Sequence, residues 1–286
     1  MKFLSLLLAV TILCLSLSGC VPAGETGQIA ATTGFLYTFT TQLCQGTDLT
    51  VTQLVTENVS CLHDYSLSVR QVRAAEAAEV IIFSGGGLED FMADILSGKD
   101  TIDSSCGILL AESHHDHADH HHEGDPHFWL SPELAKVMVQ NICNGLSARY
   151  PACASQFADN LTALLAKLDA LQTYGEAQLS NLNSREIITF HDGFSYFAES
   201  FDLTILKAVE EESGSEASAS ELKSLITLVR DHHLPAIFTE AYGSTSAAQI
   251  ISRETGVAVY TLHMTMTGDY FTAMYQNIDT MKEALG

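Results

Sequence analysis

Residues 155–182 constrain the fold of this chain more than any other segment, because they carry an unbroken helical pattern. The segment contains no proline and only one glycine. Its leucines recur at the i, i+3, i+4, i+7 and i+10 spacing of one helix face, and they are Leu161, Leu164, Leu165, Leu168 and Leu171. A helix over these residues extends about 40 Å at a rise of about 1.5 Å per residue. We therefore expect a stiff helix that joins two lobes.

Short apolar runs rich in β-branched residues flank this segment, and helical patterns separate them. The runs form two groups of four, at residues 27–34, 48–55, 79–85 and 107–112, and at residues 185–190, 202–209, 236–241 and 257–262. The helical patterns lie at 67–76, 132–148, 217–232 and 244–255. Such alternation is typical of parallel sheets with helices on both faces. We predict an α/β fold of two lobes, each with a four-stranded, mostly parallel sheet flanked by helices.

The start of the chain is typical of an export signal. One basic residue, Lys2, precedes an apolar stretch that is too short to span a membrane. Residues 17–20 read Leu-Ser-Gly-Cys, which is similar to the bacterial lipobox, so we expect cleavage before Cys20 and a lipid on this residue. The alternative is an ordinary secretory signal cut nearby, and either signal exports the protein. We therefore predict an extracytoplasmic location with a lipid anchor in the bacterial cell membrane.

These features set the predicted domain boundaries. The signal peptide occupies residues 1–19 and the lipidated tether 20–26. The N-terminal lobe then covers 27–150, the linking helix 151–184 and the C-terminal lobe 185–286.

The charge of the chain restricts its partners. Its formal net charge is −22, and lysine and arginine total only 13. This balance argues against binding to nucleic acid or to anionic lipid surfaces and favours a cationic partner. Beyond the signal, no apolar run reaches membrane-spanning length. We expect a monomer that contacts the membrane only through its anchor.

Five cysteines remain after the signal and the lipidated residue are removed, namely Cys44, Cys61, Cys106, Cys143 and Cys153. None of them shows the CxxC spacing of a thiolate zinc site. Disulfides are compatible with an exported chain. Sequence proximity suggests pairing of Cys143 with Cys153 and of Cys44 with Cys61, and the sequence leaves both open.

A histidine-rich tract between residues 112 and 127 points to metal. It holds seven of the twelve histidines of the chain, interleaved with aspartate and glutamate. Short tracts of this kind typically bind metal, and imidazole nitrogen suits zinc, copper or nickel. The alternatives are a solvated polar loop or a tag, although a tag would lie at a terminus. We expect weak, accessory metal binding by a loop at 113–123, through His114, His115, His117, His120, His121 and His122.

Four histidines follow predicted strands, two in each lobe: they are His63, His127, His191 and His263. In open α/β sheets the carboxyl ends of the strands form the ligand-binding edge. Four imidazoles from two facing lobes can form a tetrahedral zinc site with Zn–N distances of about 2.0–2.1 Å. A single histidine at a strand end is more often structural, but four together favour a metal site.

Several segments resemble the metal-binding receptors of zinc and manganese ABC importers (cluster A-I), and the zinc-uptake type in particular. The likeness lies in CLHDY with AAEVIIFSGGGLEDFM, in DPHFWLSPELAKVM after the histidine-rich tract, in ITFHDGFSYFAESFDL, in IFTEAYGSTSAAQIISRETGVAVYTL and in DYFTAMYQNIDTMKEAL. It implies a receptor that captures Zn²⁺ between its lobes and delivers it to the permease of the importer. The metal positions of the family map onto His63, His127 and His191. Manganese-type members usually carry glutamate at the third of these.

The fourth ligand departs from the family pattern. The family commonly has aspartate or glutamate where this chain has His263, so water, Glu240 or Asp269 is an alternative. Asp64, Asp192 and Glu240 flank the predicted ligands, where carboxylates hold ligand imidazoles by hydrogen bonds. They are equally compatible with ordinary surface acids. We expect Trp129 to pack in the core behind His127.

Two other functions remain open. One is a manganese-binding receptor or adhesin of the same family. The other is a secreted zinc hydrolase, but the chain lacks an HExxH motif, and four histidine ligands would fill the open position that catalytic zinc needs. We therefore expect that this protein is not an enzyme.

Overall fold

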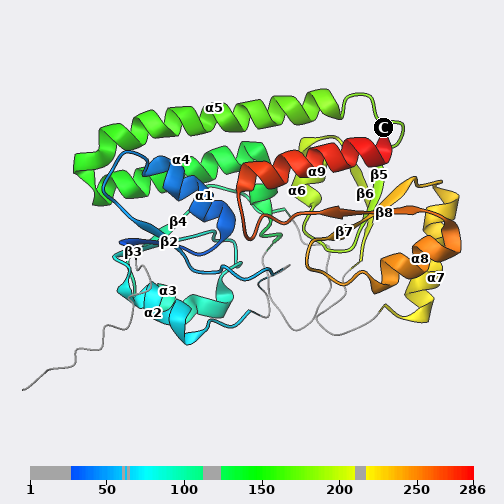
Figure 1. Cartoon of the computed structure of the whole chain (residues 1–286), viewed down its shortest axis with the longest axis horizontal. Helices are drawn as coiled ribbons and strands as arrows, with labels where there is room; N and C mark the ends of the chain where they lie inside the picture. The colour runs from blue at the N-terminus through cyan, green and yellow to red at the C-terminus, as the bar shows by residue number, and fades with distance from the viewer. Residues whose placement is uncertain (1–26, 60–61, 63–64, 112–123, 210–216) are drawn as a thin grey trace, which may run out of the picture.

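The computed structural model describes residues 27–59, 62, 65–111, 124–209 and 217–286. Two α/β lobes lie side by side beneath the long helix α5 (Ala154–Gln178), which extends over both of them (Figure 1). Its 25 residues correspond to about 38 Å of helix. The leucine stripe behaves as predicted, because Leu161, Leu164, Leu168 and Leu171 are buried. No helix within these described ranges is long and apolar enough to cross a membrane.

The sheet of the N-terminal lobe has the strand order β2-β1-β3-β4, and all of its strands are parallel. Its strands are β1 (Ile29–Ala31), β2 (Val51–Gln53), β3 (Val80–Phe83) and β4 (Thr101–Asp103). Side chains alternate between the faces: Ile29 and Ala31 join the main core, whereas Ala30 faces a smaller cluster. The main-core side is covered by α1 (Gly34–Leu43) and α4 (Pro132–Arg149), and the other by α2 (Val69–Ala77) and α3 (Ala93–Ser97). Short 3-10 turns occur at η1 (Asp90–Met92), η2 (Phe128–Leu130) and η3 (Pro151–Cys153).

The C-terminal lobe repeats this plan with the strand order β6-β5-β7-β8, again all parallel. Its strands are β5 (Glu186–Thr189), β6 (Thr204–Ala208), β7 (Ala236–Glu240) and β8 (Ala258–Leu262). Its helices are α6 (Ser195–Ser200), α7 (Ala219–Asp231), α8 (Ser246–Thr255) and α9 (Tyr270–Leu285). Helices α7 and α8 enclose a separate apolar cluster on one face, while α9 covers the other and packs on α5. The fold class predicted from the sequence is confirmed.

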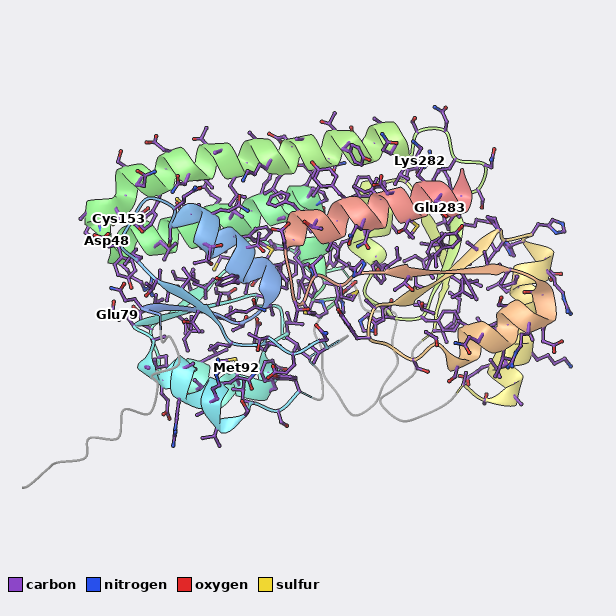
Figure 2. All side chains as sticks on the ribbon, viewed as in Figure 1. Asp48, Glu79, Met92, Cys153, Lys282 and Glu283 are labelled. Atoms are coloured by element: carbon purple, nitrogen blue, oxygen red, sulfur yellow. The ribbon has the colours of Figure 1, made fainter. Side chains whose placement is uncertain are left out.

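One buried core connects the lobes. Side chains fill the layer between α5, α9 and the two sheets (Figure 2). The indole Nε1 of Trp129, in the N-terminal lobe, donates to the carbonyl of Met264 at 2.9 Å. The hydroxyl of Tyr270 donates to the Trp129 carbonyl at 2.9 Å, and the Gly34 amide donates to the Met266 carbonyl at 2.7 Å. The lobes are therefore joined by packing and buried hydrogen bonds as well as by the chain.

The predicted strand at residues 107–112 is wrong. The fourth strand is β4, which begins six residues before the predicted one. Ile102 is its only buried residue. Gly107 has a φ of +81°, which turns the chain away from the sheet, and Leu109 is 92% exposed. Ile108, Leu110 and Ala111 still pack against the main core, so an apolar run can contribute to a core without its backbone joining the sheet.

The cysteines of the described residues are free. Cys44 and Cys143 are buried thiols, Cys153 is half-buried and Cys106 is exposed. The suggested pairing of Cys143 with Cys153 is therefore absent from the structure, and Cys44 is unpaired as well. Cys61 lies outside the described residues.

Candidate metal centre

His127 and His191 meet where the carboxyl edges of the two sheets face each other. Their Nε2 atoms lie 3.3 Å apart, and their rings are nearly perpendicular at 89°. His127 immediately precedes η2 and is only 2% exposed, and the His191 side chain is 12% exposed. One imidazole comes from each lobe, so the pair spans the lobe boundary.

Strand register brings Glu240 beside His191. Thr189 in β5 pairs with Phe238 in β7, so the residues two positions later, His191 and Glu240, fall level on the same face. The Glu240 Oε2 lies 3.7 Å from the His191 Nδ1, and Glu240 is only 6% exposed. A carboxylate therefore faces the ring nitrogen of His191 that points away from His127.

The carboxylate of Asp125 likewise faces the Nδ1 atom of His127. Its Oδ1 lies 2.7 Å from the His127 Nδ1 and also accepts the His127 amide at 2.9 Å. Burial opposes ionisation of Asp125, but hydrogen bonds from His127 and Ser195 outweigh it and hold the pKa of this carboxyl below its ordinary value. A carboxylate only accepts hydrogen bonds, so the Nδ1 of His127 carries the proton. The Nε2 of the neutral ring then keeps its lone pair for a metal.

The separation of the two Nε2 atoms fits a shared zinc ion. Zinc binds imidazole nitrogen at about 2.0–2.1 Å in tetrahedral sites, which places two nitrogen ligands about 3.3–3.4 Å apart. The observed distance is 3.3 Å. The pair therefore matches one edge of a zinc tetrahedron.

Apolar groups enclose the imidazole pair. The Trp129 ring lies 5.2 Å from the His127 ring and is fully buried, as predicted. At Gly193, an added Cβ would lie 2.6 Å from the Met264 Cε, 2.7 Å from the His191 Cδ2 and 3.0 Å from the His127 Cδ2. The two rings and the methionine thus converge on a glycine. Apolar surroundings exclude water and lower the local dielectric constant, which strengthens the electrostatic interactions of a bound cation.

His263 occupies a different position. Leu262 pairs with Glu240, so His263 lies one residue beyond the row that contains Glu240 and His191. The side-chain amide of Asn277 holds its backbone, accepting from the His263 amide and donating to its carbonyl, both at 2.8 Å. Its ring makes no hydrogen bond or ion pair within the described chain, and burial lowers the pKa of His263. It lines a small cavity of about 40 Å³ together with Val59 and Tyr242.

The other candidate residues are distributed as follows. Asp269 is exposed and caps α9, where its Oδ1 accepts the Thr272 amide at 2.8 Å. Asp192 follows His191 and is half-buried. The remaining candidates lie outside the described residues: they are Cys20, His63, Asp64, His114, His115, His117, His120, His121 and His122. Among the residues that the structure describes, no group of three or more His, Cys, Asp or Glu side chains is arranged to hold a metal.

Asp125 was not among the residues predicted for the site. Its carboxylate contacts His127 only because the chain turns between them, as the hydrogen bond from the His127 amide shows. The one available signal was the Asp-Pro-His spacing at residues 125–127.

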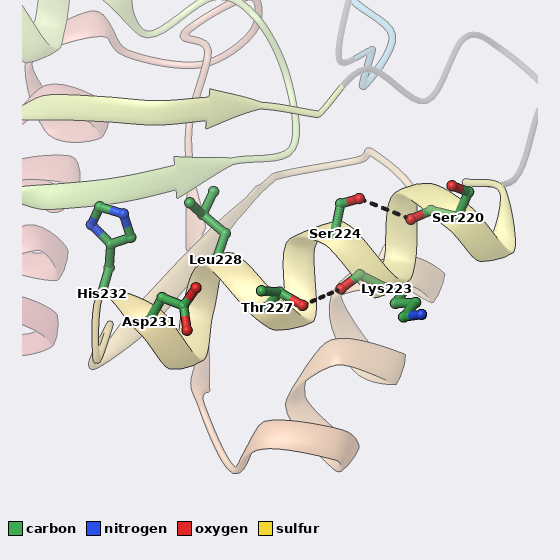
Figure 3. Close-up of a pocket in the computed structure, with 7 residues that line it drawn as sticks. All are labelled: Ser220, Lys223, Ser224, Thr227, Leu228, Asp231 and His232. Atoms are coloured by element: carbon green, nitrogen blue, oxygen red, sulfur yellow. Dashed lines mark hydrogen bonds between the residues drawn. The ribbon is translucent and has the colours of Figure 1, made fainter.

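A hollow of about 460 Å³ lies elsewhere, along α7 (Figure 3). Ser224 and Thr227 in this hollow direct their hydroxyls back to carbonyls of their own helix, at 3.1 and 3.0 Å. It contains none of the predicted metal ligands.

Comparison with known proteins identifies related sequences over almost the whole chain. A family model described as zinc-uptake complex component A, periplasmic, matches residues 29–284. The zinc-binding lipoprotein AdcA of Streptococcus pneumoniae serotype 4 is 30% identical over 308 residues, which cover 99% of this chain and 61% of that protein. The zinc-binding protein AdcA of Streptococcus pyogenes serotype M3 is 27% identical over 251 residues, with coverage of 77% and 49%. The chain thus matches about half to three-fifths of the length of these relatives.

Solved structures share the fold. A crystal structure of ZnuA has a TM-score of 0.80 at 28% identity and covers 90% of this chain and 98% of that one. The crystal structure of Zn(II)-bound AdcA from Streptococcus pneumoniae has a TM-score of 0.77 at 26% identity, with coverage of 90% and 57%. Together with the family match across residues 29–284, these similarities show that the chain belongs to the family of periplasmic A components of zinc-uptake complexes.

Proposed function

We propose that this protein is a receptor that captures Zn²⁺ between its lobes and delivers it to the permease of an ABC importer. Its family consists of zinc-uptake components, and the relatives from both streptococci are named zinc-binding. Zinc is the cargo here, and the receptor performs no chemistry on it. A shell of four protein ligands would leave no open position for a catalytic water, which favours a receptor over a zinc hydrolase.

The observation that carries the proposal is the imidazole pair. The Nε2 atoms of His127 and His191 are separated by the edge length of a zinc tetrahedron, and each Nδ1 faces a carboxylate. Carboxylates behind ligand imidazoles fix the tautomer and raise the basicity of the metal-binding nitrogen. Two carboxylates also offset the charge of a bound dication.

The proposed ligand set adds His63 to this pair. Leu62, the residue before His63 in the sequence, is buried, and its carbonyl accepts the Tyr65 amide at 3.0 Å. His263 is the predicted fourth ligand, and Glu240, which faces His191, is the alternative. Three imidazoles favour Zn²⁺ over Mn²⁺, which prefers oxygen ligands and binds nitrogen sites more weakly. Tight Mn²⁺ binding in a competition titration would support the manganese receptor instead.

The proposal extends to the location of the receptor. We place it outside the cytoplasm, anchored by a lipid on Cys20, as its N-terminal sequence and its lipoprotein relative suggest. We also propose that it is a monomer. The histidine-rich loop at 113–123 supplies accessory sites that bind zinc more weakly than the site between the lobes. Deleting residues 114–122 should therefore remove weak zinc equivalents and leave the tight one.

Zinc titration of single variants tests the site. His63→Ala, His127→Ala and His191→Ala should each weaken the tight zinc equivalent by more than about a hundredfold, because an incomplete ligand shell holds zinc poorly. His232→Ala is the matched control, since its ring also pairs with a carboxylate, that of Glu186 at 2.9 Å, but on the surface. Unchanged affinity in any of the three ligand variants removes that residue from the site.

Delivery needs its own experiment. Receptor loaded with ⁶⁵Zn should drive uptake into proteoliposomes that contain the ABC permease, and His127→Ala receptor should not. Equal uptake with and without receptor would contradict the proposed role.

A further inference from the structure

Tyr196 crosses the lobe boundary next to the imidazole pair. It belongs to α6, five residues after His191, and is only 4% exposed. Its hydroxyl accepts the Ala111 amide at 2.8 Å and donates to the Asp125 carbonyl at 2.9 Å. The hydroxyl of a C-terminal-lobe side chain thus both accepts and donates a hydrogen bond, and both partners are backbone groups of the N-terminal lobe.

The two residues whose backbone groups this hydroxyl contacts are also hydrogen-bonded to each other. The Asp125 amide donates to the Ala111 carbonyl at 2.9 Å, so residues 111 and 125 form a closed stem. The Tyr196 ring also makes an edge contact with Phe128, with centroids 6.5 Å apart. Tyr196 therefore fixes the chain on both sides of His127.

Asp125 connects this stem to the metal centre. Its carbonyl receives the Tyr196 hydroxyl, and its carboxylate holds both the amide and the Nδ1 of His127. The oxygen of Tyr196 and the ring of His127 are thus separated by a single residue that binds both. His191 belongs to the same lobe as Tyr196, so this link fixes His127 relative to the imidazole that faces it.

We propose that Tyr196 is a positioning residue for zinc capture, which holds Asp125 and thereby sets His127 at its zinc-binding distance from His191. The inference rests on the proposed function, because it assigns a role within that same site. Tyr196 touches neither the metal nor a ligand nitrogen and acts through the backbone of Asp125. Without its hydroxyl, two backbone groups lose a shared partner, and one of the links between the His127 segment and the opposite lobe is lost.

Removal of the hydroxyl tests the inference. Tyr196→Phe should weaken zinc binding by about tenfold, the lower end of the range for groups that orient metal ligands. Tyr174→Phe is the matched control, since its hydroxyl donates to Asp279 of α9 at 2.6 Å in an exposed hydrogen bond. Dissociation constants come from competition with a chelator. Tyr196→Phe that binds zinc as tightly as the parent overturns the inference and leaves the proposed function intact, whereas a parent without tight zinc binding overturns both.

A double-mutant cycle separates positioning from a general effect on the fold. If Tyr196 acts through Asp125, Tyr196→Phe combined with Asp125→Asn should lose much less affinity than the product of the two single losses. Losses that multiply would show that the two residues act independently and would contradict the inference.

Amide exchange provides a measurement that needs no variant. If the hydrogen bonds of Tyr196 favour zinc binding, bound zinc must stabilise these hydrogen bonds in turn, because coupling between two sites is reciprocal. The Ala111 amide, which donates to the Tyr196 oxygen, should therefore exchange with D₂O several-fold more slowly in the zinc-loaded protein. Equal exchange rates with and without zinc would count against the positioning role.

Discussion

Asp125 and Glu240 each place a carboxylate behind a histidine of the metal centre. Both acids are buried, at 6% exposure each. A buried carboxylate is costly unless it is hydrogen-bonded or faces positive charge. Asp125 meets this requirement through His127, and a dication held between the rings would balance both acids. At the scale of residues, the site is therefore prepared for a cation before one arrives.

The charge of Asp125 can be tested directly. Asp125→Asn keeps the shape of the side chain but removes the negative charge behind His127, so zinc affinity should fall about 10- to 100-fold. Glu186→Gln is the matched control, because Glu186 lies behind the surface residue His232. Calorimetric titration of both variants measures the effect. Parent-like affinity of Asp125→Asn would show that His127 needs no carboxylate partner.

The fourth ligand can be identified by comparing substitutions at two positions. If His263 binds zinc, His263→Asp should retain substantially more zinc affinity than His263→Ala, because a carboxylate oxygen is also a zinc ligand. If Glu240 takes this position, Glu240→Gln should lose affinity while both His263 variants bind like the parent. Affinities measured from pH 7.5 to pH 5 add a second readout. Affinity should fall as the pH drops through about 6.5, because protonated imidazole cannot bind metal.

At the scale of elements, the loops that follow the strands are fixed by buried polar groups. Glu89 joins the carboxyl ends of β1 and β3: it accepts the Thr32 hydroxyl at 2.6 Å and the Ser84 and Gly85 amides at 2.8 and 3.2 Å. An added Cβ on Gly86 would lie 3.1 Å from the Phe128 ring. The loop held by Glu89 thus packs against the residue that follows His127.

Glu89 should make stability depend on pH. Burial raises the pKa of Glu89 to about 7, above the ordinary value of 4.5. Between these values the folded protein binds more protons than the unfolded chain, so its stability rises as the pH falls from about 7 toward 4.5. The effect is on the order of 1 kcal/mol per pKa unit. Unfolding of zinc-free protein at several pH values should show this trend in the parent and a flatter one in Glu89→Gln.

The strands and the metal centre were predictable from the sequence to different degrees. Seven of the eight strands lie within runs that the apolar pattern predicts, because each contributes apolar side chains that are buried in a core or packed against one. β4 was missed because only one of its three residues, Ile102, is apolar, so it forms no apolar run. His127 and His191 could be placed at strand-end loops, but their 3.3 Å contact depends on how the lobes face each other. The roles of Asp125 and Tyr196 depend on turns and lobe contacts that no spacing encodes.

At the scale of the whole molecule, the lobes share their largest apolar core. Trp129 from the N-terminal lobe and Tyr270 from the C-terminal lobe belong to it, and both are fully buried. Stacking of Phe35 on Trp129, with centroids 4.4 Å apart, extends this core beneath α5. Wide separation of the lobes would expose these rings. We therefore expect zinc release to involve shifts of the loops around the site.

A shared core predicts a single unfolding transition. Calorimetry of the zinc-free protein should give one peak, with equal calorimetric and van't Hoff enthalpies, because neither lobe keeps its core without the other. Trp129→Ala should lower stability by about 3–5 kcal/mol and shift the whole transition. Two separated peaks in the parent would show that the lobes fold independently.

One zinc ion should bind between the lobes through His127 and His191. A crystal of the zinc-loaded protein, with data collected on both sides of the zinc absorption edge, tests it most directly. We expect a strong anomalous peak about 2.0–2.1 Å from the Nε2 atoms of both residues. A well-occupied zinc ion elsewhere, with these two nitrogens bound to no metal, would contradict it.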